Sequence, residues 1–212
     1  HTMDGHPAPR MAGDAELRYE MKGILKGELV RLSAIDPDEF GQAFSRWNRD
    51  SEFMRLLDGS PSKLRSQKRL QKSLEEDLEN QKSDRHWFAI RALVDDKLLG
   101  DIDLSVDNWT SRDAFVGLGI GEREFWGKGY GTDVMKVILR YAFTEVNLRR
   151  VTLNVFEYNV RAIRSYEKTG FRHEGRMRQV LKREGQRWDM LFMGILREEW
   201  IHLQQQEREN IR

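Results

Sequence analysis

The sequence predicts a mixed α/β (α+β) fold, in which helices cover both faces of one central sheet. Three observations lead to this prediction. Apolar residues recur with a helical period early in the chain, the period changes to two between residues 86 and 120, and strand-like and helical segments then alternate. Segments in this order pack as layers of helices against a sheet.

Composition places the chain among single-domain globular proteins. It has 212 residues, of which 39% are hydrophobic, and 36 Lys and Arg residues against 35 Asp and Glu residues give a net charge of +1. This length corresponds to one domain. A balanced charge argues against a nucleic-acid binder, which needs a field of positive charge. No apolar run approaches the length of a membrane span, so we expect no membrane partner.

Residue types also limit the chemistry. The absence of cysteine excludes disulfides, thiolate metal sites and a cysteine nucleophile. The five histidines lack the spacing of a zinc site, so no metal is expected. The N-terminus lacks a basic region followed by an apolar stretch. We therefore expect a cytoplasmic protein.

The first twenty residues are set apart from the rest. They hold two of the four prolines and no periodic apolar pattern, and a methionine follows His1 and Thr2. We expect residues 1–20 to be a flexible tail or an expression remnant, and residues 21–212 to be a single domain.

The first predicted elements are one strand and two helices. Val30 and Leu32 alternate with polar residues, which indicates a short strand. Residues 37–48 and 62–81 are typical of helices. The second helix has an acidic outer face and is expected to bury one stripe of leucines: Leu64, Leu70, Leu74 and Leu78.

The remaining elements follow from changes of period and from turn residues. Three strands of a meander are expected at 86–92, 98–106 and 114–120. They are followed by a buried helix over 132–145, a strand over 151–156, and a helix over 159–169 that begins at Asn159 and ends before Gly170. Strands over 171–181 and 187–196 complete the prediction, with their turn near Glu184 and Gly185.

The loop between the strand that ends at Ile120 and the buried helix has the composition of an anion site. Gly127, Gly129 and Gly131 let the backbone approach a ligand, and the first turn of the helix leaves N–H groups unpaired. Lys128 adds a positive charge, so a phosphate or pyrophosphate is the expected guest. The alternative is that the glycines only form a tight turn.

Two common phosphate motifs do not fit this loop. A Walker loop needs Ser or Thr after Gly-Lys, but Gly129 follows Lys128, and its upstream glycine is replaced by Glu122. A dinucleotide fingerprint needs a third glycine where the chain has Thr132.

Two motifs in this order resemble the GCN5-related N-acetyltransferase (GNAT) family. The first is the glycine loop, and the second is Asn159-Val160-Arg161-Ala162-Ile163-Arg164-Ser165-Tyr166-Glu167-Lys168-Thr169-Gly170-Phe171. The likeness extends from about residue 30 to residue 200 and is closest to the branch of the ribosomal-protein N-terminal acetyltransferases and spermidine acetyltransferases. One position departs from the family's Gln/Arg-x-x-Gly-x-Gly/Ala motif, because Trp126 stands where Gln or Arg is usual.

The resemblance implies a mostly antiparallel sheet with one splayed parallel pair, and acetyl-CoA as the cosubstrate within that splay. Backbone groups of Leu118 to Ile120 would bind the pantetheine arm, and N–H groups from Gly127 to Thr132 would hold the pyrophosphate. The glycines of this strand are consistent with a bulge or a close ligand approach. The residues implied at the cosubstrate are Leu118, Gly119, Ile120, Trp126, Gly127, Lys128, Gly129, Tyr130, Gly131, Thr132, Asn159, Ala162 and Tyr166.

Tyr166 is the predicted catalytic acid. A phenol near the sulfur can protonate the departing thiolate, and the helical period places Asn159 and Tyr166 on one face. The alternative is a core tyrosine with a satisfied hydroxyl.

The general base is less defined by the sequence. An amine arrives mostly protonated, so a carboxylate or a water chain must accept its proton. Five acidic residues are candidates, and we select Glu52 because it lies between the opening helices, which wall the acceptor pocket in the family. The candidates are Asp50, Glu52, Asp113, Glu122 and Glu157.

These observations predict direct transfer of acetyl from acetyl-CoA to a primary amine. The acceptor is either a peptide or protein N-terminus or a small amine such as a polyamine, which Asp50, Glu52 and Asp58 would suit if they lie together. Two alternatives stay open: a non-catalytic acyl-CoA sensor or structural module, and a nucleotide-binding module that uses the loop for ATP. By analogy with relatives, a homodimer is also expected.

Overall fold

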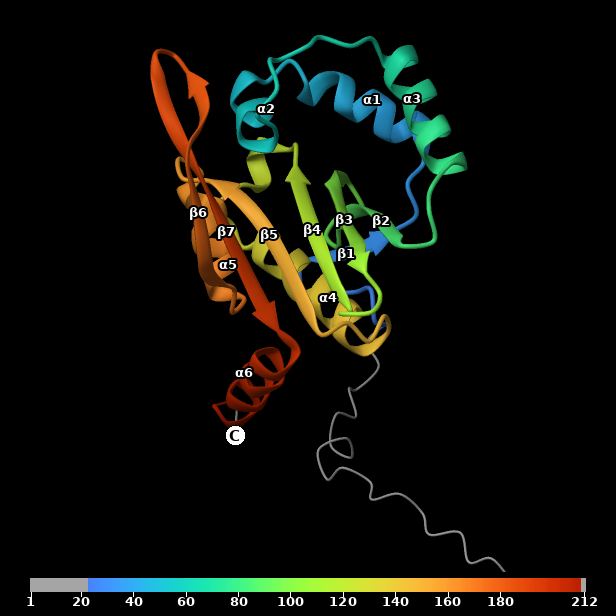
Figure 1. The fold of residues 1–212 in the computed structure, drawn as a ribbon. Coiled ribbons are helices and arrows are strands. Elements are labelled where there is room, and N and C mark those ends of the chain that lie inside the picture. The colour runs from blue at the N-terminus through green and yellow to red at the C-terminus, as the bar shows by residue number, and fades with distance from the viewer. Residues whose placement is uncertain (1–22, 211–212) are drawn as a thin grey trace, which may run out of the picture.

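A single seven-stranded sheet organises the molecule in the computed structural model, which describes residues 23–210 (Figure 1). The strand order is β1-β2-β3-β4-β5-β7-β6, and six α-helices flank the sheet within the described residues. The expected tail over residues 1–20 lies outside this part of the chain. The predicted mixed, mostly antiparallel α/β fold is therefore confirmed.

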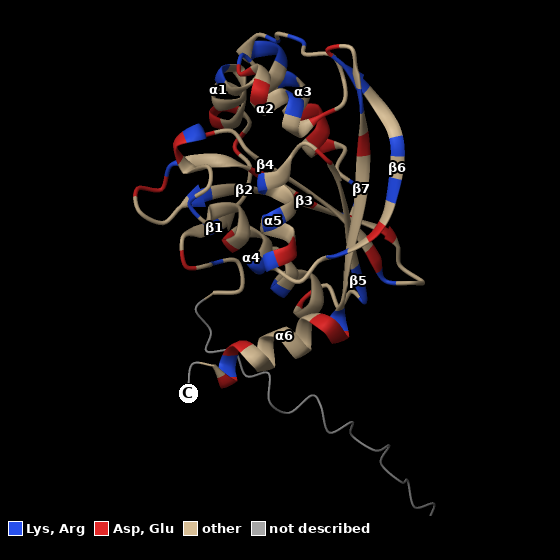
Figure 2. Cartoon of the chain, turned by 90° about the vertical axis from the view of Figure 1, so that its left-hand side faces the viewer, with Lys and Arg blue, Asp and Glu red and all other residues tan. Residues whose placement is uncertain are grey.

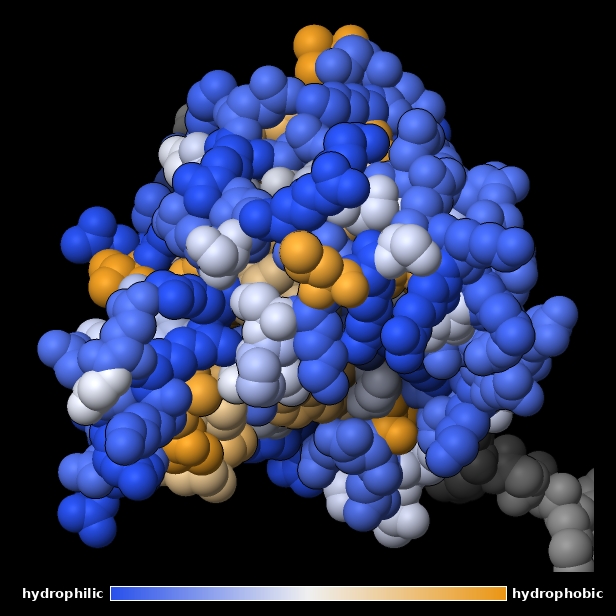
Figure 3. All heavy atoms as spheres, turned by 90° about the horizontal axis from the view of Figure 1, so that it is seen from above, coloured by the Kyte–Doolittle hydropathy of each residue, from blue (hydrophilic) through white to orange (hydrophobic). Residues whose placement is uncertain are grey.

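The N-terminal elements place three helices over one end of the sheet (Figure 1). Strand β1 (Val30–Ser33) leads into α1 (Pro37–Trp47), α2 (Ser51–Leu57) and α3 (Gln67–Glu79). Seen from above, this end of the molecule is mostly hydrophilic, with hydrophobic side chains only in small patches (Figure 3).

Two predictions in this region are wrong. Helix α3 begins at Gln67 because the Ser66 side chain caps it, so Leu64 precedes the helix and is 79% exposed. The separate short helix α2 was not predicted, and it begins where the Asp50 side chain accepts hydrogen bonds from two backbone N–H groups of its first turn.

The predicted meander is confirmed as β2 (Arg85–Ala92), β3 (Leu98–Asn108) and β4 (Asp113–Ile120). Strands β3 and β4 pair in an unbroken register across Gly117 and Gly119, and the irregularity lies near Val106 instead. The bulge considered for these two glycines is therefore wrong, and the close approach of a ligand stays a prediction.

The parallel pair splays as expected. Strand β5 (Arg150–Phe156) pairs with β4 only where Asp113 to Phe115 lie beside Arg150 to Thr152. Beyond Phe115 the two strands share no pairs, and β5 pairs with β7 along its length instead. The end of β4 at Ile120 is thereby left open on its β5 side.

Helices α4 (Tyr130–Thr144) and α5 (Val160–Lys168) lie on the face of the sheet away from α1 and α3. The buried side of α4 packs on alternate residues of β3 and β4, such as Ile102, Leu104 and Val116. The opposite face of the sheet packs on α1 to α3 through a second, aromatic cluster that includes Phe40, Trp47 and Phe53. The 3-10 helix η1 (Arg123–Phe125) connects β4 to the glycine loop.

The C-terminal part is a hairpin followed by a helix. Strands β6 (Arg172–Arg183) and β7 (Gln186–Leu196) turn at Glu184 and Gly185, both with positive φ, as predicted. Lys and Arg residues recur along β6, which forms one edge of the sheet (Figure 2). Helix α6 (Arg197–Glu209) was not predicted. Within residues 23–210, no helix combines the length and apolar character that crossing a membrane requires.

Candidate active site

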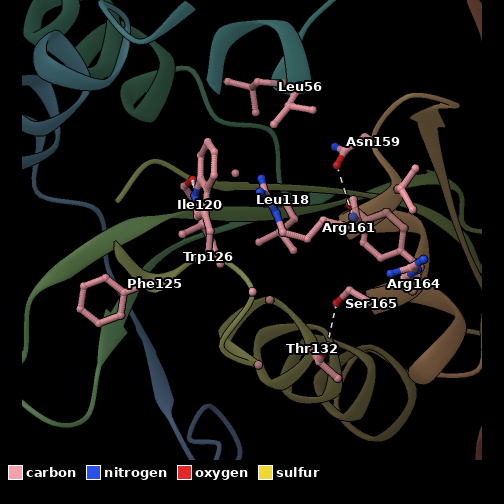
Figure 4. A pocket seen from close by; sticks show the side chains of 18 of the residues that line it. Leu56, Leu118, Ile120, Phe125, Trp126, Thr132, Asn159, Arg161, Arg164 and Ser165 are labelled. Carbon is pink, nitrogen blue, oxygen red and sulfur yellow. Dashed lines mark hydrogen bonds between the residues drawn. The ribbon is translucent and has the colours of Figure 1, made fainter. Parts of the chain in front are cut away.

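A cavity of about 430 Å³ opens where β4 and β5 diverge, and we call it the first cavity (Figure 4). Its walls are the end of β4, the glycine loop, the start of α4 and one face of α5, and α2 covers it. Most of the sequence-predicted residues line it together: Leu118, Gly119, Ile120, Trp126, Gly127, Gly129, Gly131, Thr132, Asn159, Ala162 and Tyr166.

The glycine loop presents free backbone donors to this cavity. Gly127 and Gly129 have φ angles of 71° and 92°, which other residues adopt only with strain. Gly129 caps α4 without a side-chain hydrogen bond, and the first backbone bond of the helix runs from the Asp133 N–H to the Gly129 carbonyl. The N–H groups of residues 130–132 therefore have no partner in the described part of the chain, and they carry the positive end of the helix dipole.

Trp126 lines the cavity, and its ring stacks against the guanidinium of Arg161. Its Nε1 donates a hydrogen bond of 2.7 Å to the carbonyl of Ile120, which fixes the ring. The Arg161 guanidinium lies over this ring, 4.0 Å from its centroid. The position where relatives usually have Gln or Arg thus supports a cation supplied by α5 instead.

Three basic residues of α5 line the cavity and were not predicted as site residues. They are Arg161, Arg164 and Lys168. Their spacing of three and four residues places them on one helix face, and this periodicity is the signal in the sequence that could have found them. The cavity therefore has two independent sources of attraction for phosphate. One is this set of basic side chains, and the other is the free N–H groups at the start of α4.

Two hydrogen bonds order the α5 side of the cavity: one joins α5 to α4, and the other caps the start of α5 (Figure 4). The Thr132 and Ser165 hydroxyls lie 2.9 Å apart and join the first turn of α4 to α5. The Asn159 side-chain oxygen accepts from the Ala162 N–H at 3.2 Å, as the predicted cap requires. This bond leaves the amide nitrogen of Asn159 as a donor at the cavity.

Tyr166 lies in the second turn of α5, and its side chain is buried. The residue is only 8% exposed, and burial raises the pKa of its hydroxyl to about 12. The hydroxyl has no hydrogen-bond partner among residues 23–210. A phenol in this state keeps its proton at neutral pH and can give it to a group that enters the cavity.

A second cavity, of about 460 Å³, lies on the α1 to α3 side of the sheet. It meets the first cavity, because six residues line both: Leu56, Leu57, Leu118, Gly119, Asn159 and Tyr166. Carboxylates of Asp77, Asp101 and Asp103 line only the second cavity. One cavity is therefore basic and the other acidic, and Tyr166 lies where they join.

Comparison with known protein families agrees with this geometry. The family model "Acetyltransferase (GNAT) domain" matches residues 30–172. This match spans strands β1 to β5, the glycine loop and α5. The chain belongs to the GNAT acetyltransferase family.

Relatives of this acetyltransferase support the same assignment. The SPbeta prophage-derived uncharacterized N-acetyltransferase YokL of Bacillus subtilis is 29% identical over 82% of this chain and 93% of its own length. A GNAT-family acetyltransferase from Bacillus anthracis has the same fold, with a TM-score of 0.68, 20% identity, and coverage of 82% of this chain and 98% of that one.

A further structural neighbour was solved with ligands. Spermidine N-acetyltransferase from Vibrio cholerae, in complex with CoA and spermine, superimposes with a TM-score of 0.70 and 23% identity, covering 81% of this chain and 98% of that one. The family model and the N-acetyltransferase relatives together identify the chain as an acetyl-CoA-dependent acyltransferase of the GNAT type. No cluster of three or more His, Asp or Glu residues suited to a metal ion occurs among its described residues.

Two residues of the predicted cosubstrate set lie outside the lining of the first cavity. Lys128 is exposed at the tip of the glycine loop. Tyr130 packs edge-on against Phe125, with ring centroids 4.8 Å apart. The side chains of these two residues do not line the first cavity, and their role at the cosubstrate stays a prediction.

The acidic residues considered as bases are engaged elsewhere. Glu52 has a 54% exposed side chain, forms an ion pair with Arg123 at 2.7 Å, and lines neither cavity. Asp50 caps α2 and also binds Arg123, which lowers the pKa of its carboxyl. Asp113 lies at the far end of β4 from Ile120.

The other two candidates are bound by neighbouring donors. Glu122 accepts a 2.9 Å hydrogen bond from the Trp47 indole. Burial alone would raise the pKa of the Glu122 carboxyl, but its hydrogen bonds, above all that from Lys97, outweigh burial and lower this pKa. Glu157 accepts from the backbone N–H of Asp189 at 2.8 Å.

Three acidic residues line the second cavity, Asp77, Asp101 and Asp103, and none of them was predicted as a site residue. The two on β3 alternate with the core residues Ile102 and Leu104, so the period of two places both carboxylates on the other face of the sheet. The alternation predicts the strand, but it does not show whether the polar face meets solvent or a cavity.

Proposed function

We propose that this protein transfers acetyl from acetyl-CoA directly to a primary amine, through a ternary complex without a covalent enzyme intermediate. The observation that carries the proposal is the junction of a basic and an acidic cavity at Tyr166. Direct transfer requires the two reactants to lie side by side, and holding them so lowers the barrier substantially.

The first cavity suits the cosubstrate. The N–H groups from Gly127 to Thr132 would hold the pyrophosphate, with Arg161, Arg164 and Lys168 as charged partners. The open edge of β4 at Leu118 to Ile120 would bind the pantetheine arm and polarise the thioester carbonyl. Trp126, Asn159 and Ala162 would complete the walls, with the Asn159 amide as a donor to the arm.

Tyr166 is proposed as the acid. When the amine attacks the thioester carbon, the carbon–sulfur bond breaks and the sulfur leaves with the electron pair. The raised pKa of Tyr166 keeps its proton available for that thiolate at neutral pH.

The acceptor is proposed to be either a small amine such as a polyamine or a peptide N-terminus. The Vibrio cholerae neighbour was solved with spermine, and the carboxylates of the second cavity would suit a cationic amine. The single-domain organisation over 21–212, the homodimer and the cytoplasmic location stay predictions.

One experiment separates acetyl transfer from mere binding. The purified protein is incubated with acetyl-CoA and, in turn, with spermidine, spermine, short peptides with free N-termini and an aminoglycoside, while released thiol is measured. We expect amine-dependent thiol release with at least one of them. Tight CoA binding without release on any amine would favour the acyl-CoA sensor.

A further inference from the structure

The second cavity brings a carboxylate to the place where an acceptor amine would meet the thioester. Asp101 of β3 pairs across the sheet with Gly119 of β4, and Asp103 pairs with Gly117. Both carboxylates lie on the cavity face, opposite the α4 core. The amine would reach the thioester from this side, because the other face of the sheet is packed by α4.

The glycines of β4 keep this path open. A Cβ built on Gly119 would lie 3.0 Å from Cδ1 of Leu57 in α2 and 3.6 Å from Oδ1 of Asp101, and one built on Gly117 would lie 2.8 Å from Oδ1 of Asp103. No side chain of β4 therefore separates these carboxylates from the strand edge. Gly119 lines both cavities, and Asp101 is its pairing partner on the neighbouring strand. Asp101 therefore lies next to the place where the two cavities join.

The carboxylate of Asp101 is held in a defined orientation. Its Oδ2 accepts a 2.8 Å hydrogen bond from Nε1 of Trp87, and this leaves Oδ1 directed at Gly119. Arg85 stacks on Trp87 at 4.2 Å and pairs with Asp103 at 3.4 Å, which ties the neighbouring groups together.

Its surroundings also suit proton transfer. Burial and the negative charge of Asp103 raise the pKa of Asp101 to about 6. The Trp87 hydrogen bond and the charge of Arg85 lower this pKa, but by less. A carboxylate with this pKa is ionised at neutral pH and is a stronger base than an ordinary surface acid. The other titratable groups that line the cavity are Arg65, Asp77 and Tyr166.

We propose that Asp101 is the catalytic proton acceptor for the primary amine, and that the amine occupies the second cavity as a cation beside Asp103. This inference rests on the proposed acetyl transfer. It replaces Glu52 as the base, since Glu52 is paired with Arg123 and lines neither cavity.

The proton balance of the step is complete. The ammonium gives one proton to Asp101, which later releases it to solvent, and the nitrogen lone pair forms the bond to the thioester carbon. The carbon–sulfur bond breaks, and its electron pair leaves on sulfur, which takes the proton of Tyr166. The second proton lost by nitrogen restores Tyr166, so the products are the acetamide, free CoA thiol and one proton in solvent.

The test compares Asp101→Asn with Glu52→Gln and with Asp107→Asn, a matched change at an exposed residue of the same strand. The reaction uses acetyl-CoA and whichever amine is turned over by the wild type, and kcat/KM is measured across pH. CoA affinity is measured for each variant by calorimetry, which shows that the first cavity is intact.

We expect D101N to lower kcat/KM by about 100-fold or more with an unchanged CoA dissociation constant. The wild-type rate should rise through pH 6 and level off, whereas D101N should show no such step. E52Q and D107N should keep the wild-type profile. Wild-type rate and profile in D101N, or loss of the step in E52Q instead, would overturn the inference. A wild type that binds CoA but turns over no amine would refute the proposed function itself.

Discussion

Tyr166 is the residue that we propose as the proton donor to the departing thiolate. The residue is only 8% exposed and lines both cavities, its hydroxyl has no hydrogen-bond partner among residues 23–210, and a raised pKa keeps the proton on it. Replacement by Phe removes the proton donor and little volume. We expect Tyr166→Phe to lower kcat by about 100-fold, while CoA affinity changes less than twofold, measured by thiol release and calorimetry. An unchanged kcat would show that the tyrosine only packs against Phe171.

Arg161 provides a second test at this scale. Its guanidinium lies over Trp126 and faces the free N–H groups of α4. Loss of one charged phosphate contact costs about 1.4 kcal/mol, so Arg161→Ala should weaken CoA binding about tenfold.

The control for Arg161 is Arg149→Ala, an exposed arginine near the start of β4, at the opposite end of this strand from the cavity. It should leave the CoA dissociation constant unchanged. Arg161→Lys should recover part of the affinity, because the charge is kept but the planar stacking group is lost. Equal affinity of R161A and wild type would remove Arg161 from the phosphate site.

At the scale of elements, the first turn of α4 joins the anion site to the N-terminal strand. The buried carboxylate of Asp133 accepts backbone N–H bonds from Glu28, Leu29 and Val30 at 3.1, 2.8 and 3.0 Å. The same turn presents its own N–H groups to the first cavity. The position of the cosubstrate loop therefore depends on how β1 is attached.

Asp133→Asn tests this attachment. The amide has one oxygen where the carboxylate has two, so at least one buried N–H loses its acceptor and the free energy of unfolding should fall by about 2 kcal/mol. Asp38→Asn is the matched control, because Asp38 is also acidic and lies in a first helical turn, that of α1, but is solvated. It should cost less than about 1 kcal/mol. Equal urea midpoints for the two variants would contradict the role of Asp133.

The same scale shows which elements the sequence could predict. The meander and α4 were found because their apolar periods differ clearly from each other. Helix α2 was missed because seven residues are too few to establish a period, and its start depends on the Asp50 cap. The spacing of the leucines places Leu64 in a helix, but the helix begins only at Gln67, after the capping residue Ser66.

At the scale of the whole molecule, the site arises from contacts between elements distant in sequence. The glycine loop and Tyr166 were predictable because each belongs to a local motif. The pairing of Asp101 with Gly119 and the stacking of Arg161 on Trp126 join different elements, and no local pattern announces them. More of the first cavity than of the second was therefore predictable from the sequence.

The central claim is that free amides at the start of α4 hold the diphosphate of CoA. Calorimetry of CoA with wild type and with Gly129→Val tests it most directly, since Gly129 has a φ of 92° that valine adopts only with strain. We predict saturable binding by the wild type and affinity weaker by about 100-fold in G129V. No heat with CoA or acetyl-CoA in the wild type, or equal affinity in the folded variant, would contradict the account.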